Sequence, residues 1–543
     1  MISDELQQQT GTTYPSMNEF DQAYLVPDGT DLQGIKDTLE AKCRIGEDEP
    51  HHLLRRFYDT FDWSLYHAGG VLEERIDGHQ RFMIWRELNG EVPTLACELH
   101  QDLGFAADLP AGIDTPRLAR LLGIRRLLPL LEVNSRILTW RLLNEDDKTI
   151  ARLELEQNRY DDKERERQGP ISTRLRLHAV KGYESDFRDT ARILNEELGL
   201  SLARTELLLE ALATAGRKPG DYSSQLNFHL DPERRADATT KEILLHLLNS
   251  IEVNVPGTRS TLDSEFLHDL RVAVRRTRSA LTQIKDVFAP DVVEQYKDAF
   301  GWIGEFTGPV RDLDVYLLDF NAYQACLPEP LRPHLEPLRD FILAHYGEEQ
   351  KTQVEHLDSR RFRDLLRNWR IFLEAPVPES SVVPNAMRPV KAVADARIWT
   401  MYKRVRKEGR AMTPTSPPED MHELRKSCKK LRYLIEFFDS LYPKQEVRQL
   451  VKLLKVLLDN LGKFQDLAVQ ADHLRGMAQR MRDEDRASTD TLLAMGVLVG
   501  DLLEHQHRAR EEFTQIFASF DGEEHQGLFK TLFDAQKRQG KGA

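Results

Sequence analysis

The segment HDLRVAVRRTR at residues 268–278 recurs as HELRKSCKKLR at residues 422–432. The copies lie 154 positions apart, and their histidines, leucines and most of their basic residues match position by position. The same offset continues downstream, where Gly308 aligns with Gly462 and Asp312 with Asp466. Self-similarity at a fixed offset is typical of a duplicated structural unit. The C-terminal half is therefore predicted to contain one helical unit twice.

Each copy separates basic from apolar residues when it is placed on an α-helix at 100° per residue. Leu270 and Val274 belong to an apolar face of the first copy, and the opposite face is basic. Like charges one turn apart repel each other, whereas solvated faces usually alternate charges, so the pattern favours a polyanionic partner. Each basic stripe is about 15 Å long, more than one phosphate requires. The stripe residues are His268, Arg271, Arg275, Arg276 and Arg278 in the first copy and His422, Arg425, Lys429, Lys430 and Arg432 in the second.

This repeat resembles the CHAD domain, the conserved-histidine α-helical domain, over roughly residues 226–520. The resemblance implies two pseudo-symmetric helical bundles whose basic helices face each other across a groove or pore that binds inorganic polyphosphate. It also implies that the stripe residues contact phosphate and that the protein associates with polyphosphate granules. We interpret Asp312 and Asp466 as carboxylates that orient an arginine of their own repeat, and not as metal ligands.

The N-terminal part has a different pattern. Residues 71–180 contain short alternating runs, such as RFMIWREL at 81–88, RILTWRLL at 136–143 and ISTRLRLHAV at 171–180, which predict antiparallel strands. Helical periodicity returns at 186–214. The predicted fold class is α+β, with an N-terminal antiparallel β-barrel-like domain followed by an all-α, internally duplicated helical bundle.

Two N-terminal segments, FYDTFDWSLYHAGGVLEER at 57–75 and RTELLLEALA at 204–213, resemble parts of the CYTH domain, the triphosphate tunnel fold, over about residues 31–214. That resemblance implies an E-x-E-x-K motif on the first strand, whose acids serve a divalent metal and whose lysine serves the triphosphate. The best alignment is Thr38-Leu39-Glu40-Ala41-Lys42, in which Thr38 replaces the first acid.

A later CYTH strand is also expected to carry alternating acids. On ISTRLRLH the inward set is either Ser172, Arg174, Arg176 and His178 or Thr173, Leu175 and Leu177, and neither is acidic. With too few carboxylates for Mg²⁺ or Mn²⁺, we interpret this domain as a degenerate tunnel without catalytic residues or metal ligands. The residues expected to retain anion binding are Glu40, Lys42, Arg75, Arg86, Arg152 and Arg174.

The leading functional hypothesis is a polyphosphate-binding protein that requires no cofactor. The alternative is a CYTH-type inorganic triphosphatase that hydrolyses tripolyphosphate with Mg²⁺ or Mn²⁺, in which Glu154 and Glu156 supply the acids through a different alignment. An adaptor for nucleic acid or an acidic protein is a third hypothesis. Nucleic acid is disfavoured because the net charge is −14 and nucleic-acid-binding domains are usually basic.

No run of eighteen apolar residues and no secretory signal occurs, so the sequence predicts a cytoplasmic protein without a membrane segment. Stretches rich in Gly, Pro and Ser divide the chain. The predicted divisions are an N-terminal tail (1–30), the degenerate CYTH-like domain (31–214), a linker (215–225), the first CHAD repeat (226–374), a second linker (375–385), the second CHAD repeat (386–520) and a C-terminal tail (521–543). Polyphosphate length preference, oligomeric state and biological role stay open.

Overall fold

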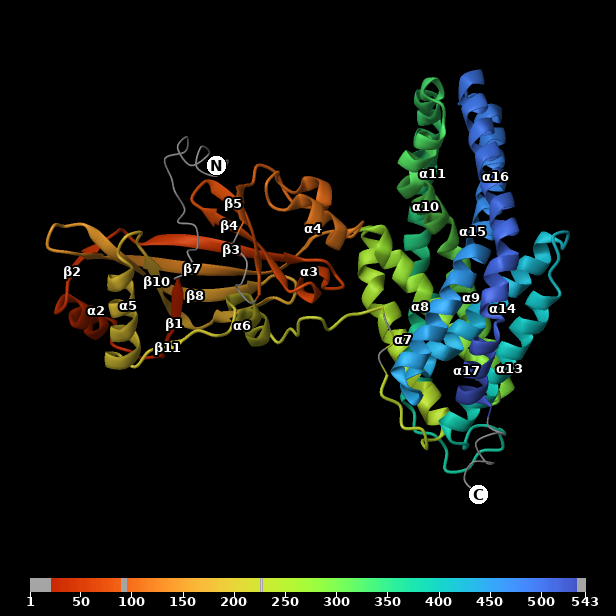
Figure 1. The fold of residues 1–543 in the computed structure, drawn as a ribbon, viewed down its shortest axis with the longest axis horizontal. Helices are drawn as coiled ribbons and strands as arrows, with labels where there is room; N and C mark the ends of the chain where they lie inside the picture. The colour runs from red at the N-terminus through yellow and green to blue at the C-terminus, as the bar shows by residue number, and fades with distance from the viewer. Residues whose placement is uncertain (1–20, 89–94, 225, 227, 535–543) are drawn as a thin grey trace. The chain divides into compact units, whose positions relative to one another are not determined.

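The computed structural model of the chain describes residues 21–88, 95–224, 226 and 228–534. Two compact units are present, residues 1–223 and residues 224–543, which we call the sheet unit and the helical unit (Figure 1). The sheet unit is an antiparallel sheet with a few helices, and the described elements of the helical unit are helices joined by loops. The predicted α+β class is confirmed.

The described strands of the sheet unit form one sheet in the order β11-β1-β10-β8-β7-β3-β4-β5-β6, with β2 paired to β7 and β9 to β8, and all of these pairs are antiparallel. The strands are β1 (Gln22–Val26), β2 (Arg44–Glu47), β3 (His51–Asp59), β4 (Gly70–Asp77), β5 (Gln80–Glu87), β6 (Leu95–Glu98), β7 (Leu128–Leu143), β8 (Thr149–Asp162), β9 (Arg167–Pro170), β10 (Thr173–Ala179) and β11 (Ser201–Leu202). The α-helices of this unit are α2 (Leu32–Glu40), α3 (Ser64–His67), α4 (Thr115–Leu122), α5 (Glu184–Arg192) and α6 (Leu207–Thr214).

Strand β10 shows why the sheet has one apolar and one polar face. Side chains alternate along a strand, and Leu175 and Leu177 are fully buried in a cluster with Phe187 of α5. Arg174 and Arg176 therefore point to the opposite face. Two sets of inward-facing residues were considered for this strand. The set that contains Arg174, Arg176 and His178 lines the cavity described below.

The structure contradicts the strand expected for the E-x-E-x-K motif. Thr38 lies in helix α2, and Lys42 follows that helix, so the alignment at 38–42 is wrong. Ile35 and Leu39 are buried one turn apart, which is helical and not strand periodicity. The first described strand is β1, and it lies inside the stretch predicted as the N-terminal tail, of which residues 1–20 fall outside the described residues.

The helical unit contains α7 (Ala236–Arg259), α8 (Ser264–Gln283), α9 (Pro290–Phe306), α10 (Gly308–Cys326), α11 (Glu336–Leu357), α12 (Arg360–Glu374), α13 (Val390–Arg410), α14 (Pro418–Phe437), α15 (Lys444–Asp483), α16 (Thr489–Phe520) and α17 (Glu523–Phe533). Short 3₁₀ turns cover 329–335 and 439–441. Helix α17 lies in the stretch predicted as a C-terminal tail. It is packed on the rest of the unit, because Phe529 is fully buried and stacks on Tyr402 of α13.

The duplication produces a pseudo-two-fold arrangement. The Ala236 amide donates to the Arg388 carbonyl at 2.9 Å, and the equivalent Val390 amide donates to the Arg234 carbonyl at 2.8 Å. At a second place the Tyr316 hydroxyl donates to the backbone carbonyl of its own counterpart, Gln470, at 3.3 Å. A residue that contacts its own counterpart lies on the axis relating the two copies, so these contacts mark the pseudo-two-fold axis.

The copies differ at one joint. The first copy breaks at Thr307 into α9 and α10, whereas α15 runs through the equivalent position for 40 residues. Pro309 follows the break and removes a helical hydrogen bond, and the second copy has Lys463 there. A single proline therefore explains why one copy has two helices where the other has one.

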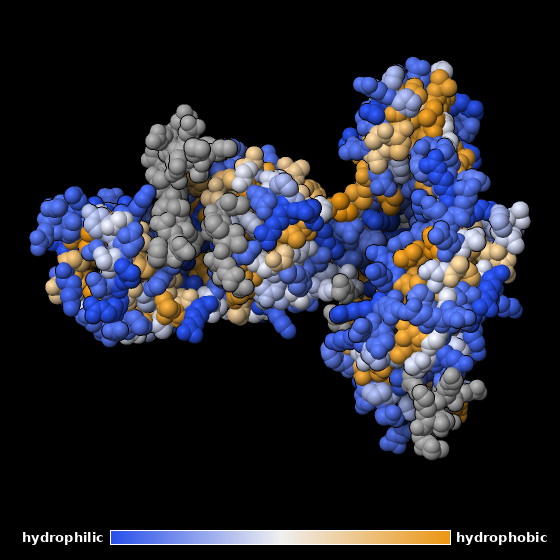
Figure 2. Space-filling model, viewed as in Figure 1, coloured by the Kyte–Doolittle hydropathy of each residue, from blue (hydrophilic) through white to orange (hydrophobic). Residues whose placement is uncertain are grey.

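Two apolar clusters hold the helical unit together. The larger joins residues of both repeats, and a smaller one lies between α10, α11, α15 and α16, which project together in Figure 1. Apolar side chains reach the surface of these projecting helices (Figure 2), and Leu318 and Leu343 are among the exposed ones. Within the described residues, no helix is long and apolar enough to span a membrane.

Candidate functional sites

The two basic stripes lie beside each other in the helical unit. Helix α8 packs against α14, and Arg276 of the first stripe forms an ion pair with Glu436 of α14 at 3.2 Å. Arg275 lies close enough to Lys429 of the other repeat to lower its pKa. Residues of both stripes are thus close together where α8 packs against α14. We call the ten predicted residues the cationic surface.

Three arginines of the first stripe form no ion pair within the described part of the chain. Arg275 and Arg278 are exposed and form no ion pair with any described residue. Arg271 donates to the Gly304 carbonyl at 2.9 Å and to the Thr307 hydroxyl at 2.8 Å, at the joint between α9 and α10. Those bonds fix the guanidinium without neutralising it, because neither acceptor is charged.

The second stripe is partly neutralised. Arg425 pairs with Asp466 at 3.0 Å and Arg432 with Glu436 at 2.6 Å. Lys429 and Lys430 form no ion pair with a described residue. Burial, together with the charges of Arg425 and Arg275, lowers the pKa of Lys429 to about 8. The protein therefore holds an ammonium group among other cations at a cost that an anion would relieve.

The repeated spacing of histidine, glycine and aspartate has a partial structural explanation. His268 and His422 are both partly buried, and the Nδ1 of His422 has no hydrogen-bond partner among the residues that the structure describes. Asp466 orients Arg425 as expected for a carboxylate within its own repeat. A Cβ at Gly462 would lie 3.6 Å from Arg425 Nη2, an ordinary van der Waals distance, so the contact with Arg425 does not explain the repeated glycine.

The first repeat holds its arginine differently. Asp312 lies near enough to Arg271 for their charges to interact, but the hydrogen bonds of Arg271 go to the Gly304 carbonyl and the Thr307 hydroxyl instead. The predicted role, an aspartate that orients an arginine of its own repeat, is therefore seen as a hydrogen-bonded pair only for Asp466 and Arg425.

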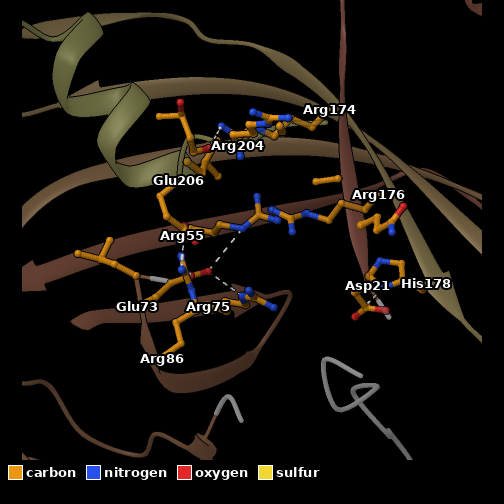
Figure 3. A pocket seen from close by; sticks show the side chains of 16 residues that line it. Asp21, Arg55, Glu73, Arg75, Arg86, Arg174, Arg176, His178, Arg204 and Glu206 are labelled. Carbon is orange, nitrogen blue, oxygen red and sulfur yellow. Dashed lines mark hydrogen bonds and ion pairs between the residues drawn. The ribbon is translucent and has the colours of Figure 1, made fainter. Parts of the chain in front are cut away.

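A second cationic site is a cavity of about 210 Å³ in the sheet unit, which we call the arginine cavity. Its arginines come from the neighbouring strands β3, β4 and β5, from β10, which β8 and β7 separate from them, and from the loop before α6, so the sheet curves around it (Figure 3). The cationic residues lining it are Arg55, Arg75, Arg86, Arg174, Arg176, His178 and Arg204.

Buried carboxylates neutralise part of this charge. Glu73 is 1 % exposed and pairs with Arg75 at 2.7 Å, Arg55 at 3.5 Å and Arg86 at 3.6 Å. Glu156 pairs with Arg55 at 2.5 Å and Arg176 at 2.9 Å. Burial would raise the pKa of both carboxyl groups, but the arginine charges outweigh it and lower each pKa to about 2. Both carboxylates therefore stay ionised and paired at neutral pH.

His178 adds a further positive charge. Burial would lower its pKa, but ion pairing with Asp21 and Glu154 raises the pKa of the imidazole to about 9. The distances are 3.2 Å from Nδ1 to Asp21 and 3.1 Å from Nε2 to Glu154. His178 is therefore a doubly paired imidazolium at neutral pH.

The carboxylates in and around the cavity do not fit a divalent metal. Glu73, Glu154 and Glu156 each already pair with arginine or histidine, and Mg²⁺ or Mn²⁺ would have to compete with those cations for its oxygen ligands. Among the described residues, no group of three or more His, Cys, Asp or Glu side chains is arranged to hold a metal ion. Metal binding at these three carboxylates would therefore require breaking existing ion pairs.

The predicted tunnel residues separate into two sets. Arg75, Arg86 and Arg174 line the cavity as expected. The other three do not line it. Lys42, just after α2, pairs with Glu197 at 3.3 Å. Glu40 and Arg152 are exposed. Glu40 and Lys42 were misplaced because the 38–42 segment begins in a helix and not in a strand.

Other residues that line the cavity were not predicted from the sequence. Arg55 and Glu73 lie on β3 and β4, and their closeness to β10 depends on the curvature of the sheet. The alternation of Arg174, Arg176 and His178 was the available signal for the basic wall.

Comparisons with known proteins identify the helical unit. Residues 242–475 match the CHAD domain family. The chain thus contains a CHAD domain, and the family resemblance inferred from the duplicated helix is confirmed.

One relative is an uncharacterized protein of Mycobacterium tuberculosis (strain ATCC 25618 / H37Rv), 25% identical over 315 residues; the match spans 56% of this chain and 56% of that relative. Among solved structures, the CHAD domain of the plant Ricinus communis is 24% identical, with a TM-score of 0.45, and the match covers 55% of this chain and 96% of that one. A putative adenylyl cyclase from Hippeastrum, described as having a dominant triphosphatase activity, is 12% identical, with a TM-score of 0.25, and the match covers 37% of this chain and 99% of that one.

Proposed function

We propose that the cationic surface formed by α8 and α14 binds inorganic polyphosphate. The observation that carries the proposal is the closeness of cations from both repeats without matching acids, above all Arg275 beside Lys429. A linear polyanion can contact successive cations along both stripes and relieve their mutual repulsion. Binding of this kind would target the protein to polyphosphate granules.

The experiment compares equivalent pairs of substitutions in the two repeats. Arg275→Ala/Arg278→Ala and Lys429→Ala/Arg432→Ala remove matched charges, and Arg360→Ala/Arg361→Ala on α12 is the control. Affinity for long-chain polyphosphate is measured by fluorescence anisotropy over a range of salt concentrations. Each repeat's pair should weaken binding about tenfold or more and lower the salt slope by about 1.4, by analogy with single-stranded nucleic acids.

The outcomes separate the alternatives. If one repeat's pair leaves both affinity and salt slope unchanged, the two stripes do not share one ligand. If neither pair matters, the cationic surface is only a solvated face. Tighter binding of an RNA oligonucleotide of equal charge than of polyphosphate would favour the adaptor hypothesis.

The triphosphatase alternative is tested separately. We expect negligible phosphate release from tripolyphosphate with Mg²⁺ or Mn²⁺, because the carboxylates in and around the arginine cavity are paired with arginine and histidine. Turnover that is abolished by Glu156→Gln in a folded variant would overturn this expectation.

A further inference from the structure

Arg271 of the first stripe is held through one of its three nitrogens. Its Nη1 donates to the Gly304 carbonyl at 2.9 Å and to the Thr307 hydroxyl at 2.8 Å. These two bonds use both N–H groups of Nη1, and the other three donors of a guanidinium lie on Nη2 and Nε. Those three donors form no hydrogen bond with a described residue. The Nη2–Nε edge is therefore free, and its two parallel N–H groups suit two oxygens of one phosphate.

The Thr307 hydroxyl is oriented to accept from Arg271. Its single O–H donates to the Ile303 carbonyl at 2.6 Å, which leaves its lone pairs to the arginine. Hydrogen bonds in series polarise one another, so the bond to Ile303 strengthens the bond from Arg271. The Thr307 side chain is fully buried, and the arginine therefore meets little competition from water for this acceptor.

The joint between α9 and α10 supplies the other acceptor. Carbonyls in the last turn of a helix lack an intrahelical donor, and Gly304 lies in the last turn of α9, which ends at Phe306. Pro309, in the first turn of α10, has no N–H group with which to continue the earlier helix. The break thus offers Arg271 a carbonyl and a hydroxyl together, and neither acceptor carries a charge.

The second repeat lacks these acceptors. Its continuous helix α15 has Leu458 and Leu461 at the two equivalent positions. Carbonyls inside a helix are already bonded to the amide four residues on, and leucine has no polar side-chain atom. Arg425 instead donates from Nη2 to Asp466 at 3.0 Å, and its Nε has no hydrogen-bond partner among the described residues. A carboxylate thus occupies part of the edge that is free in Arg271.

We infer that Thr307 is a positioning residue, which holds Arg271 by Nη1 so that its Nη2–Nε edge meets one phosphate of the bound chain. This role rests on the proposed function, because that phosphate belongs to polyphosphate on the cationic surface. Burial lowers the pKa of Arg271, so an anion on the free edge stabilises a cation that has lost solvent. An arginine fixed in advance also loses less side-chain freedom on binding. Thr307 therefore adds affinity without touching the ligand.

The test is polyphosphate binding by Thr307→Val, which is similar in shape and lacks the hydroxyl. Affinity for long-chain polyphosphate, measured by fluorescence anisotropy, should fall about tenfold, the usual effect of one hydrogen bond to a charged group. The salt dependence of affinity should keep its slope, because the charge of Arg271 remains. Thr307→Ser, which retains the hydroxyl, should recover most of the affinity.

The matched control is Thr277→Val on α8. Thr277 is also fully buried, and its hydroxyl donates to the Ala273 carbonyl of its own helix at 3.0 Å. This substitution removes a buried hydroxyl without changing the acceptors of Arg271, so affinity should stay at the parent value. Circular dichroism verifies that both variants fold. A folded Thr307→Val variant that binds like the parent would overturn the inference.

Changes at Arg271 separate positioning from charge. Arg271→Lys keeps the charge but cannot present two parallel donors, so affinity should fall while the salt slope is kept. Arg271→Ala should weaken binding further and lower the slope by about 0.7, by analogy with single-stranded nucleic acids. Thr307→Val should add nothing in that background. An equal further loss there would show that Thr307 acts through the fold and not through Arg271.

The two proposals fail in distinguishable ways. A parent protein that does not bind polyphosphate would remove the proposed function, and the role of Thr307 with it. A parent that binds, with Thr307→Val unchanged, would remove only the role of Thr307.

Discussion

The two cationic sites of this protein differ in how their positive charges are balanced. In the arginine cavity, buried guanidinium groups are held by buried carboxylates such as Glu73 and Glu156. On the cationic surface of the helical unit, Arg275 and Lys429 lie near each other without a carboxylate partner among the described residues. The difference shows that a buried cation needs an internal counter-charge to fold, whereas a partly exposed one can leave that role to a ligand.

The largest expected effect concerns the buried pairs. Glu156→Gln should destabilise the sheet unit by about 3 to 5 kcal/mol, because Arg55 and Arg176 would lose the carboxylate that they share. Urea unfolding followed by tryptophan fluorescence measures the change. Asp466→Asn, which removes the exposed partner of Arg425, is the control and should cost less than about 1 kcal/mol. Equal effects of the two substitutions would abolish the contrast between the sites.

The second effect is pH-dependent. The pKa of His178 is raised to about 9 in the folded protein, against roughly 6.5 in an unfolded chain. Its contribution of about 3 kcal/mol is full below about pH 6.5, declines as the pH rises toward about 9, and is absent above that. Unfolding free energies of the parent and His178→Gln should therefore converge as pH rises through this range. A constant difference between them would show that His178 is not ionised in the cavity.

A smaller effect belongs to the cationic surface. Lys429 has a pKa of about 8 in the free protein, and a bound polyanion should raise it, so binding takes up a proton. Polyphosphate affinity should fall roughly tenfold from about pH 7 to pH 9. In Lys429→Arg the charge persists and the fall should be much smaller. The same pH dependence in parent and variant would assign it to other groups.

The smallest effect tests an internal competitor. Glu436 pairs with Arg276 and Arg432, and thus occupies donors of both stripes. Glu436→Gln should strengthen polyphosphate binding a few-fold, since charge-assisted hydrogen bonds become available to the ligand. Glu511→Gln, which changes an exposed glutamate of α16, is the control. Weaker binding by Glu436→Gln would mean that Glu436 positions the arginines for the ligand.

The sequence predicted the cationic surface better than the arginine cavity, for a physical reason. Helical spacing is local, so the stripe from His268 to Arg278 could be found from one segment and checked against its repeat. The cavity depends on pairing between strands that are distant in sequence, and Arg55 approaches Glu156 because β7 pairs with both β3 and β8. The strand predicted at 38–42 was wrong because it rested on a partial sequence match to the motif. The apolar residues Ile35 and Leu39 have helical spacing instead.

The pseudo-two-fold axis marked by Tyr316 and Gln470 has a consequence for the polymer proposed to bind beside it. Inorganic polyphosphate is a homopolymer whose two directions are equivalent, so a surface with the same symmetry accepts it in either direction. A shift by one phosphate reproduces the same contacts, and a longer chain therefore offers more equivalent registers. Under the proposed function, affinity per chain should rise with chain length through this multiplicity alone, while affinity per phosphate stays nearly constant.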